Sequence, residues 1–154
     1  AVALATPGDL DPMFGVGGVV TTDLPGTYYE NANAVVRQPD GKLVVTGQDA
    51  SGYAALTVIR YLPDGSLDPT FGVGGVFVAP TTDLVQIGQK LALQSDGKLI
   101  VLGSAIIRLT TDGQLDPSFG IGGIVRQLTV GGFYPFFVDL ECMYWYVCSS
   151  SPVA

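Results

Sequence analysis

The chain has 154 residues, of which 47% are hydrophobic and 14% charged, and its formal net charge is −7 with no histidine. This length is sufficient for one domain with a hydrophobic core. The seven basic residues are scattered singly, so no basic stripe is available to replace the counterions of a nucleic acid or to attract an anionic lipid surface. Without histidine, the chain lacks the commonest general base and the commonest metal-binding imidazole.

The composition predicts an all-β fold. Val, Ile, Leu, Thr, Tyr and Phe dominate the apolar residues, and 21 glycines and 10 prolines interrupt them at short intervals. The mean hydropathy of +0.41 is high for a soluble monomer and favours an assembly in which copies cover one another. The apolar run at residues 128–148 contains two glycines, Pro135, Asp139 and Glu141, which excludes a membrane-spanning helix.

An eleven-residue signature occurs three times, at residues 8–18, 65–75 and 113–123. It reads Gly-x-Leu-Asp-Pro-x-Phe-Gly-x-Gly-Gly, and eight of its eleven positions are identical in all three copies. Successive signature phenylalanines are 57 and then 48 residues apart. Self-similarity of this kind indicates a repeat architecture.

Four short strands are predicted in each repeat. A β-branched run after the signature predicts the first strand, at residues 19–22, 76–78 and 124–128. The second and third strands flank an Asp-Gly-Lys turn, and the fourth ends at another Asp-Gly turn. These strands are expected at residues 34–38, 43–47 and 56–62 in the first copy and at 90–94, 99–103 and 106–110 in the second.

The Asp-Gly pairs predict the turns of these hairpins. They begin at Asp40, Asp64, Asp96 and Asp112, each between two apolar runs. This pattern is typical of a type I′ turn, which needs positive φ at both central residues.

The chain is therefore predicted to be one all-β repeat domain. Its four-stranded antiparallel, blade-like units are of the β-propeller type, with two complete units and one partial unit. The first repeat covers about residues 8–64, the second about 65–112 and the partial third about 113–128, and an aromatic tail follows at residues 129–154. A propeller typically needs about four to eight blades to close, so two complete blades cannot close alone.

These motifs resemble the delta-60 repeat, a bacterial secreted or surface repeat. The resemblance covers residues 8 to about 127, and it rests on the three signatures, the two Asp-Gly-Lys turns and the Arg-bearing strand after each turn. It implies blades of a β-propeller, which the known relatives usually carry in long multi-repeat chains.

The repeated aspartates have two interpretations. Asp11, Asp68 and Asp116 precede proline in the signature, and the others precede glycine. We expect them to cap turns and to accept backbone hydrogen bonds. The alternative is a calcium site, with Asp64 and Asp68 in one copy and Asp112 and Asp116 in the other.

Other repeated side chains predict structural contacts. Arg60 and Arg108 each stand eight residues before a signature aspartate, so an Arg–Asp pair is expected to tie the fourth strand to the signature turn. A substrate-binding arginine is the alternative. The signature phenylalanines are predicted to plug the core between neighbouring blades, and they are Phe14, Phe71 and Phe119.

No catalytic constellation is visible in the sequence. The serines at residues 149–151 have no base partner. The glycine turns are not phosphate loops, because no helix is predicted after them. Asp139 and Glu141 form a single carboxylate pair, which is insufficient for a glycosidase site. We predict that the chain is not an enzyme and uses no cofactor.

The two cysteines, Cys142 and Cys148, both lie in the tail. A disulfide between them is predicted. It needs a turn within residues 143–147, because six residues of extended strand span ~20 Å. A bridge between subunits and two free thiols are the alternatives.

The tail is also predicted to be an assembly interface. Added to the sheet of another copy, it would satisfy an exposed edge, and a contact of this kind propagates into a ring or a filament. The aromatic residues expected there are Phe133, Tyr134, Phe136, Phe137, Tyr144, Trp145 and Tyr146.

The predicted function is that of a secreted, non-catalytic structural protein that self-assembles on or outside the cell. The chain begins Ala-Val-Ala without the basic and apolar regions of a signal peptide, as expected of a mature secreted product or a shortened chain. One alternative is an adhesin or lectin-like module that presents Tyr28, Tyr29, Tyr53 and Trp145 to a glycan or a surface protein. The other is a fragment of a larger propeller.

Overall fold

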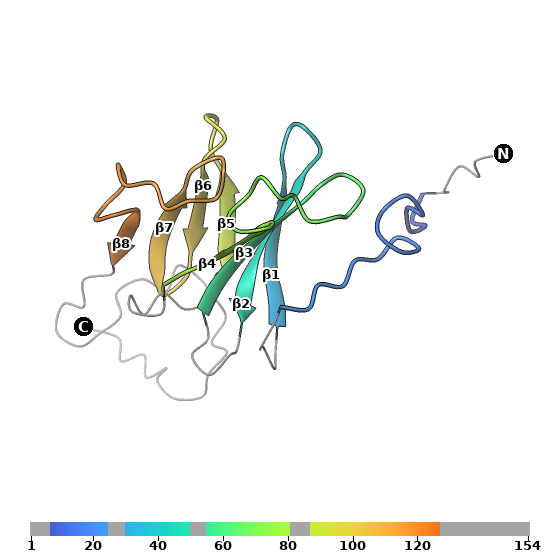
Figure 1. Cartoon of the computed structure of the whole chain (residues 1–154), viewed down its shortest axis with the longest axis horizontal. Coiled ribbons are helices and arrows are strands. Elements are labelled where there is room, and N and C mark those ends of the chain that lie inside the picture. The colour runs from blue at the N-terminus through green and yellow to red at the C-terminus, as the bar shows by residue number, and fades with distance from the viewer. Residues whose placement is uncertain (1–6, 25–29, 50–54, 81–86, 127–154) are drawn as a thin grey trace, which may run out of the picture.

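The computed structural model describes residues 7–24, 30–49, 55–80 and 87–126 of the chain (Figure 1). Within these ranges the chain forms β-strands and no helix, so none of the described residues belongs to a helix that could cross a membrane. The strands are β1 (Glu30–Arg37), β2 (Leu43–Asp49), β3 (Ala55–Tyr61), β4 (Val76–Val78), β5 (Lys90–Leu93), β6 (Leu99–Leu102), β7 (Ala105–Leu109) and β8 (Ile124–Arg126).

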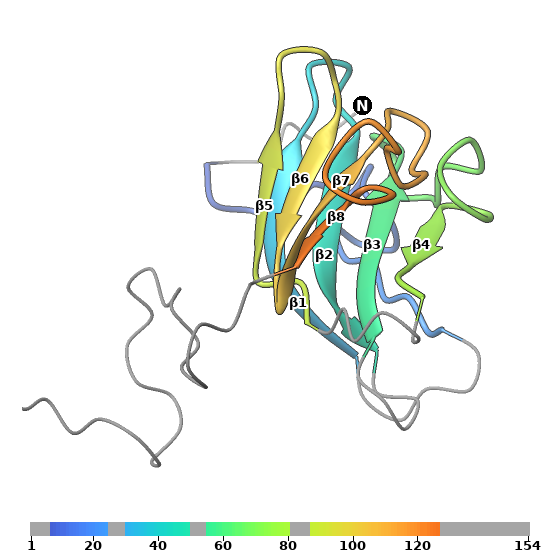
Figure 2. The same cartoon turned by 90° about the vertical axis from the view of Figure 1, so that its left-hand side faces the viewer.

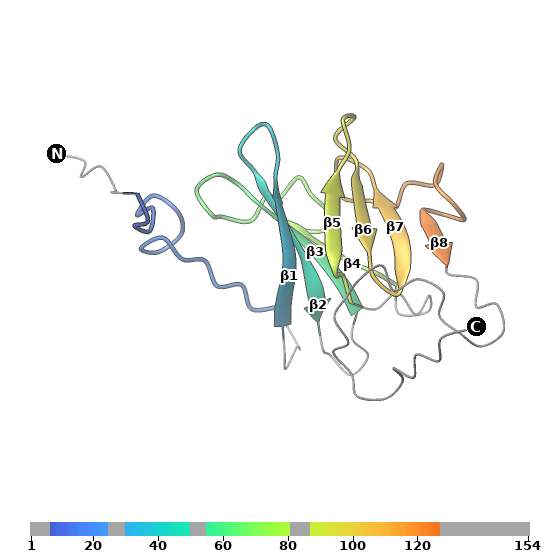
Figure 3. The ribbon, with the colours of Figure 1, turned by 180° about the vertical axis from the view of Figure 1, so that it is seen from behind.

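The strands form two antiparallel four-stranded sheets, ordered β1-β2-β3-β4 and β5-β6-β7-β8. We call these sheets the first and second blades. They lie face to face with their strands in the same order (Figure 2). Seen from behind, β5 of the second blade runs beside β1 of the first (Figure 3). The predicted all-β fold with four-stranded blade-like units is therefore confirmed.

Each blade begins at a different point of the repeat from the one predicted. The run after the second signature, β4, pairs with β3 as the last strand of the first blade, and β8 likewise completes the second blade. The corresponding residues 19–22 form no strand, and Val19 makes a single bridge with Val16. The prediction of a strand there was wrong, because these residues pair with no strand among the described residues.

The Asp-Gly turns also differ from the prediction. In the β1–β2 turn, the Gly41 N–H donates to Gln38 O at 2.9 Å and the Gln38 N–H donates to Lys42 O at 2.8 Å. Gly41 has φ +89°, whereas Asp40 has no positive φ. A type I′ turn needs both, so this is a three-residue loop with the left-handed position taken by glycine. The loop is one residue longer than predicted because Pro39 enters the turn, at a position that suits its fixed φ.

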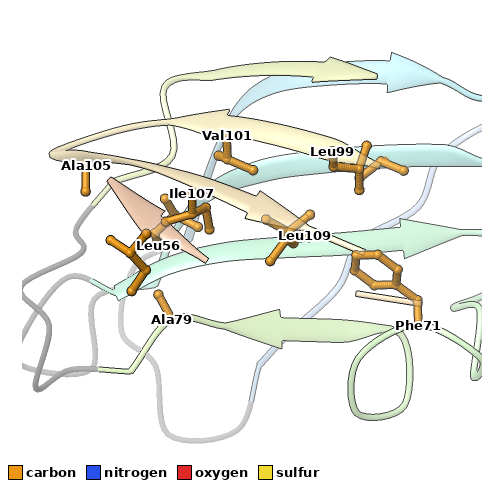
Figure 4. Packing of buried hydrophobic residues seen from close by; sticks show 11 residues of the cluster. Leu56, Phe71, Ala79, Leu99, Val101, Ala105, Ile107 and Leu109 are labelled. Carbon is orange, nitrogen blue, oxygen red and sulfur yellow. The ribbon is translucent and has the colours of Figure 1, made fainter. Parts of the chain in front are cut away.

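One hydrophobic core lies between the two blades. Along β6 and β7 buried and half-buried residues alternate, which is the pattern of strands with one face against a core. The second blade contributes Leu99, Val101, Ile107 and Leu109 to it. Leu56, Ala79 and Phe71 of the first blade face them across the core (Figure 4).

Candidate functional site

An ion-pair cluster joins the Asp-Gly-Lys turn, β3 and the second signature in the first blade. The Asp68 carboxylate lies 2.8 Å from Arg60 Nε and 3.2 Å from Lys42 Nζ. Its other oxygen accepts hydrogen bonds from the Thr70 hydroxyl at 2.7 Å and the Thr70 N–H at 3.0 Å. The Arg60 guanidinium stacks over the Phe71 ring, 4.6 Å from its centroid. The cluster therefore holds the signature against the end of β3.

Electrostatics keep the Asp68 carboxylate charged. Burial opposes the charged form, but the hydrogen bonds from Thr70 and the cations Lys42 and Arg60 hold the pKa of Asp68 well below its ordinary range. Its side chain is almost fully buried, so this charge depends on its two partners. A carboxylate whose pKa is held this low by paired cations is unsuited to accept a proton near neutral pH.

The second blade repeats the cluster. Asp116 pairs with Arg108 Nε at 2.9 Å and with Lys98 Nζ at 2.9 Å. The Ser118 hydroxyl donates to Asp116 at 2.7 Å, and the Arg108 guanidinium lies 4.6 Å from the centroid of the Phe119 ring. The hydrogen bond from Ser118, the cation Lys98 and the charge of Arg108 lower the pKa of Asp116.

The first signature has only part of this arrangement. Asp11 Oδ1 accepts a hydrogen bond from the Met13 N–H at 2.9 Å, as expected of a turn cap. Among the described residues no lysine or arginine pairs with Asp11, which is exposed.

The aspartates proposed for calcium are engaged within the protein. Asp64 Oδ1 accepts from the Ser66 N–H at 2.9 Å and from its hydroxyl at 2.6 Å. Asp112 accepts from the Thr110 hydroxyl. In the part of the chain that the structure describes, no group of three or more His, Cys, Asp or Glu residues could hold a metal ion.

The signature of one blade docks on the Asp-Gly turn of the next. The Gly72 N–H donates to Asp112 O at 2.8 Å, and Arg60 Nη1 donates to Thr111 O at 2.6 Å. A Cβ added to Gly113 would lie 2.8 Å from atoms of the Phe71 ring. Only glycine therefore fits between the turn of the second blade and the phenylalanine of the first.

A second set of contacts joins the blades near β5. The Gly88 N–H donates to Gly47 O at 2.9 Å, and Asn33 Nδ2 donates to Gly88 O at 2.9 Å. A Cβ on Gly88 would lie 2.0 Å from Thr46 Oγ1. The two blades thus make close backbone contacts both at the second signature and near β5.

The face of the first blade that meets the second is fully covered. It carries Val44, Thr46 and Val58, each 0% exposed. Through the shared register, the equivalent positions in the second blade are Ile100, Leu102 and Ile106, which are half-buried. We call the latter, together with Val125 (39% exposed), the open face of the second blade.

The first blade has an open face on its other side. The second blade presents Leu99, Val101, Ile107 and Leu109 to the first blade, all at most 1% exposed. By register, their equivalents in the first blade are Leu43, Val45, Ile59 and Tyr61, which are half-buried. We call these four residues the acceptor face of the first blade.

Two lysines were not predicted to pair with the signature aspartates. Lys42 and Lys98 carry the second positive charge on each signature aspartate, and their signal in the sequence is the lysine that both Asp-Gly-Lys turns share. The Thr70 and Ser118 hydroxyls were missed as well. Their signal is that a hydroxyl residue, Thr or Ser, follows Leu-Asp-Pro in the second and third signatures.

Several predicted site residues lie outside the described residues. They are Cys142 and Cys148, the proposed ligand-binding residues Tyr28, Tyr29, Tyr53 and Trp145, and the other aromatic residues of the tail (Phe133, Tyr134, Phe136, Phe137, Tyr144 and Tyr146).

Residues 38–71 and 94–119 match the model of a β-propeller domain of unknown function, DUF5122. Each matched stretch contains one complete copy of the cluster, from its lysine to its phenylalanine. No curated protein and no solved structure matches the chain. The fold and the matched repeats define the class of this chain as a β-propeller-type repeat protein.

Proposed function

We propose that this chain is a secreted, non-catalytic structural protein that self-assembles through its incomplete third repeat and aromatic tail. One observation carries the proposal. The open face of the second blade corresponds, position by position, to the face of the first blade that the second blade covers. The chain therefore carries within itself an example of how this face is covered.

The cluster at the open face shows the same lack of a neighbour. Phe71 is 0% exposed, whereas Phe119 is half-buried. The Arg60 side chain is 6% exposed and the Arg108 side chain 19%. The Gly72 N–H donates to Asp112 O, while the Gly120 N–H has no acceptor among the described residues. A further blade of the same kind would supply what Phe119, Arg108 and Gly120 lack.

The acceptor face of the first blade is the complementary surface within the same chain. Because the open face and the acceptor face differ, a contact between two copies is heterologous, and it extends into a ring or an open filament. Burying half-exposed Ile, Leu and Val side chains stabilises such a contact by ~25 cal/mol per Å² of apolar surface. The mean hydropathy of +0.41 agrees with a chain that assembles.

A location outside the cell is supported by composition and by resemblance. The chain is acidic, with seven basic residues against 14 acidic ones. Its signatures and Asp-Gly-Lys turns resemble the delta-60 repeat, which occurs in bacterial secreted and surface proteins. The pairing of Asp68 and Asp116 with cations, and the absence of histidine, support a role without catalysis.

The particle mass of the protein tests this function. Light scattering and negative-stain microscopy should show rings or filaments far heavier than the 16.0 kDa chain. Removal of residues 129–154 should reduce their size. A monomer at all concentrations would contradict self-assembly, and a truncated chain that assembles as before would contradict the role of the tail.

A point substitution tests the open face separately. Ile106→Lys places a charge where the next blade would bury it, so assembly should be lost. In the single chain the half-buried Lys side chain can still reach water, so the blades should remain folded by circular dichroism. Val73→Lys is the matched control. Val73 is 86% exposed at a turn tip, so this variant should assemble normally.

A further inference from the structure

The three signatures have the same local structure. In each, the N–H of the last glycine donates to the carbonyl of the phenylalanine, at 2.9 Å in the first copy, 2.8 Å in the second and 2.9 Å in the third. The second and third signatures each lead into a strand that completes a blade. The first signature leads into residues 19–22, which belong to no sheet. Among the described residues, the first signature completes no blade.

The first signature nevertheless docks on the first blade. The Gly15 N–H donates to Asp64 O at 2.8 Å, which is the bond that Gly72 makes with Asp112 O between the two blades. A Cβ added to Gly65 would lie 2.6 Å from Val20 Cγ2. Thr22 Oγ1 and the Tyr61 hydroxyl are hydrogen-bonded at 2.8 Å. The Asp64–Gly65 turn and Tyr61 therefore form a binding site for a signature.

The third signature has the complementary donor. Gly120 has the same backbone angle as Gly15, with φ +56° against +57°, and its N–H has no acceptor among the described residues. The close contact of Gly65 with Val20 leaves no room for two signatures at this turn. The first signature of the chain and the third signature of another copy therefore exclude each other there.

We infer that the first signature is an intramolecular cap on the Asp64–Gly65 turn, and that the third signature of a second copy takes its place during assembly. This inference rests on the proposed self-assembly and identifies its partner surfaces and its control. The occupant is a second copy, because the signature docked in this site has the same motif and turn as the one left open.

The cap is held less firmly than the signature between the two blades. Asp11 has no cation partner in the described chain, whereas Asp68 has two. Leu10 is 63% exposed against 36% for its equivalent Leu67, and Phe14 is half-buried whereas its equivalent Phe71 is fully buried. Because its strand segment joins no sheet, its release breaks no strand pairing of either blade.

Two equivalent substitutions in the full chain test the cap. A Cβ at Gly15 would lie 2.2 Å from Val19 O, and one at Gly120 would lie 2.3 Å from Ile124 O, so alanine does the same local damage at both positions. Gly15→Ala should weaken the cap and lower the concentration at which half the protein is assembled by about tenfold. Gly120→Ala should raise that concentration by at least a similar factor.

Sedimentation velocity over a concentration series measures both effects, and circular dichroism checks that the blades remain folded. Thr22→Val removes the hydrogen bond to Tyr61 without touching a sheet, and it should shift assembly in the same direction as Gly15→Ala by a smaller factor. This variant keeps the test decisive if a glycine variant fails to fold.

The outcomes separate the cap from self-assembly itself. If the wild type assembles and the Gly15→Ala and Thr22→Val variants assemble no better, the cap is wrong and self-assembly stands. If the Gly15→Ala gain survives in the Gly15→Ala/Gly120→Ala double variant, it comes from nonspecific association, and the cap is again wrong. If neither the wild type nor any variant assembles, both proposals fail.

Discussion

The second and third signatures build the same cluster, but different neighbours lie beside them. Both hold an aspartate between an arginine and a lysine and place a phenylalanine under the arginine. Phe71 is fully buried because the turn of the second blade covers it, whereas Phe119 is half-buried. The cluster is therefore a local feature of each blade, and the burial of its phenylalanine depends on the neighbouring blade.

The largest expected effect of a single substitution is at this phenylalanine. Phe71→Ala removes a fully buried ring and should lower the free energy of unfolding by about 4 kcal/mol. Phe119→Ala should cost roughly half as much or less, because part of its ring is already in water. Urea unfolding of dilute protein measures both values. Equal losses would show that the neighbouring blade does not distinguish the two positions.

The aspartate comes next. Asp68→Asn leaves the buried Arg60 without its counter-charge, while Lys42 keeps its ion pair with Asp40, and it should cost about 3 kcal/mol of unfolding free energy. Asp116→Asn should cost less, since Lys98 and Arg108 are better exposed. Asp11→Asn is the control, and its midpoint of thermal unfolding should equal that of the wild type. A loss at Asp11 as large as that at Asp68 would contradict the role given to the cations.

Acid should weaken both clusters. The pKa values of Asp68 and Asp116 are lowered in the folded chain from an ordinary value of 3.8, so both groups stabilise the fold above that pH. Stability should be level near neutral pH and fall progressively below about pH 4. The Asp68→Asn/Asp116→Asn variant should show a shallower fall in urea midpoint. A midpoint that rises on acidification would contradict the sign of these shifts.

The smallest effects are expected at the tips of the signatures. Val16, Val73 and Ile121 are 89%, 86% and 88% exposed, so they have the same exposure whether or not a blade follows. Substitution of any of them by serine should change the free energy of unfolding by less than about 0.5 kcal/mol. A larger loss at Val73 alone, measured by urea unfolding, would extend the contact between the blades to the tip.

Some features of this fold can be predicted from short sequence segments. The hairpins β1–β2 and β6–β7 connect neighbours in sequence, and alternation of apolar residues is sufficient to predict them. The Arg60–Asp68 contact joins residues eight apart, across a turn whose glycine and proline are visible in the sequence. The turn type was predicted wrongly because an Asp-Gly pair specifies a left-handed glycine without specifying how many residues precede it in the loop.

The blade to which a strand belongs could not be predicted in this way. Residues 19–22 and β4 each follow a copy of the signature and share a β-branched pattern. Only β4 pairs with a neighbouring strand, β3. The contact of Gly15 with Asp64 joins residues far apart in the chain. No local pattern announces that contact, because it depends on the stacking of one repeat against the next.

The sequence by itself determined the signature turn, since its glycines take positive φ in all three copies and allow the same backbone hydrogen bonds wherever the motif occurs. It also determined the cluster, whose members lie within one blade. Only the tertiary structure decided which phenylalanine is buried, which strand segment joins a sheet and which blade face the described residues cover. Those outcomes depend on a neighbouring blade, and burial is a property of two packed surfaces that neither surface has alone.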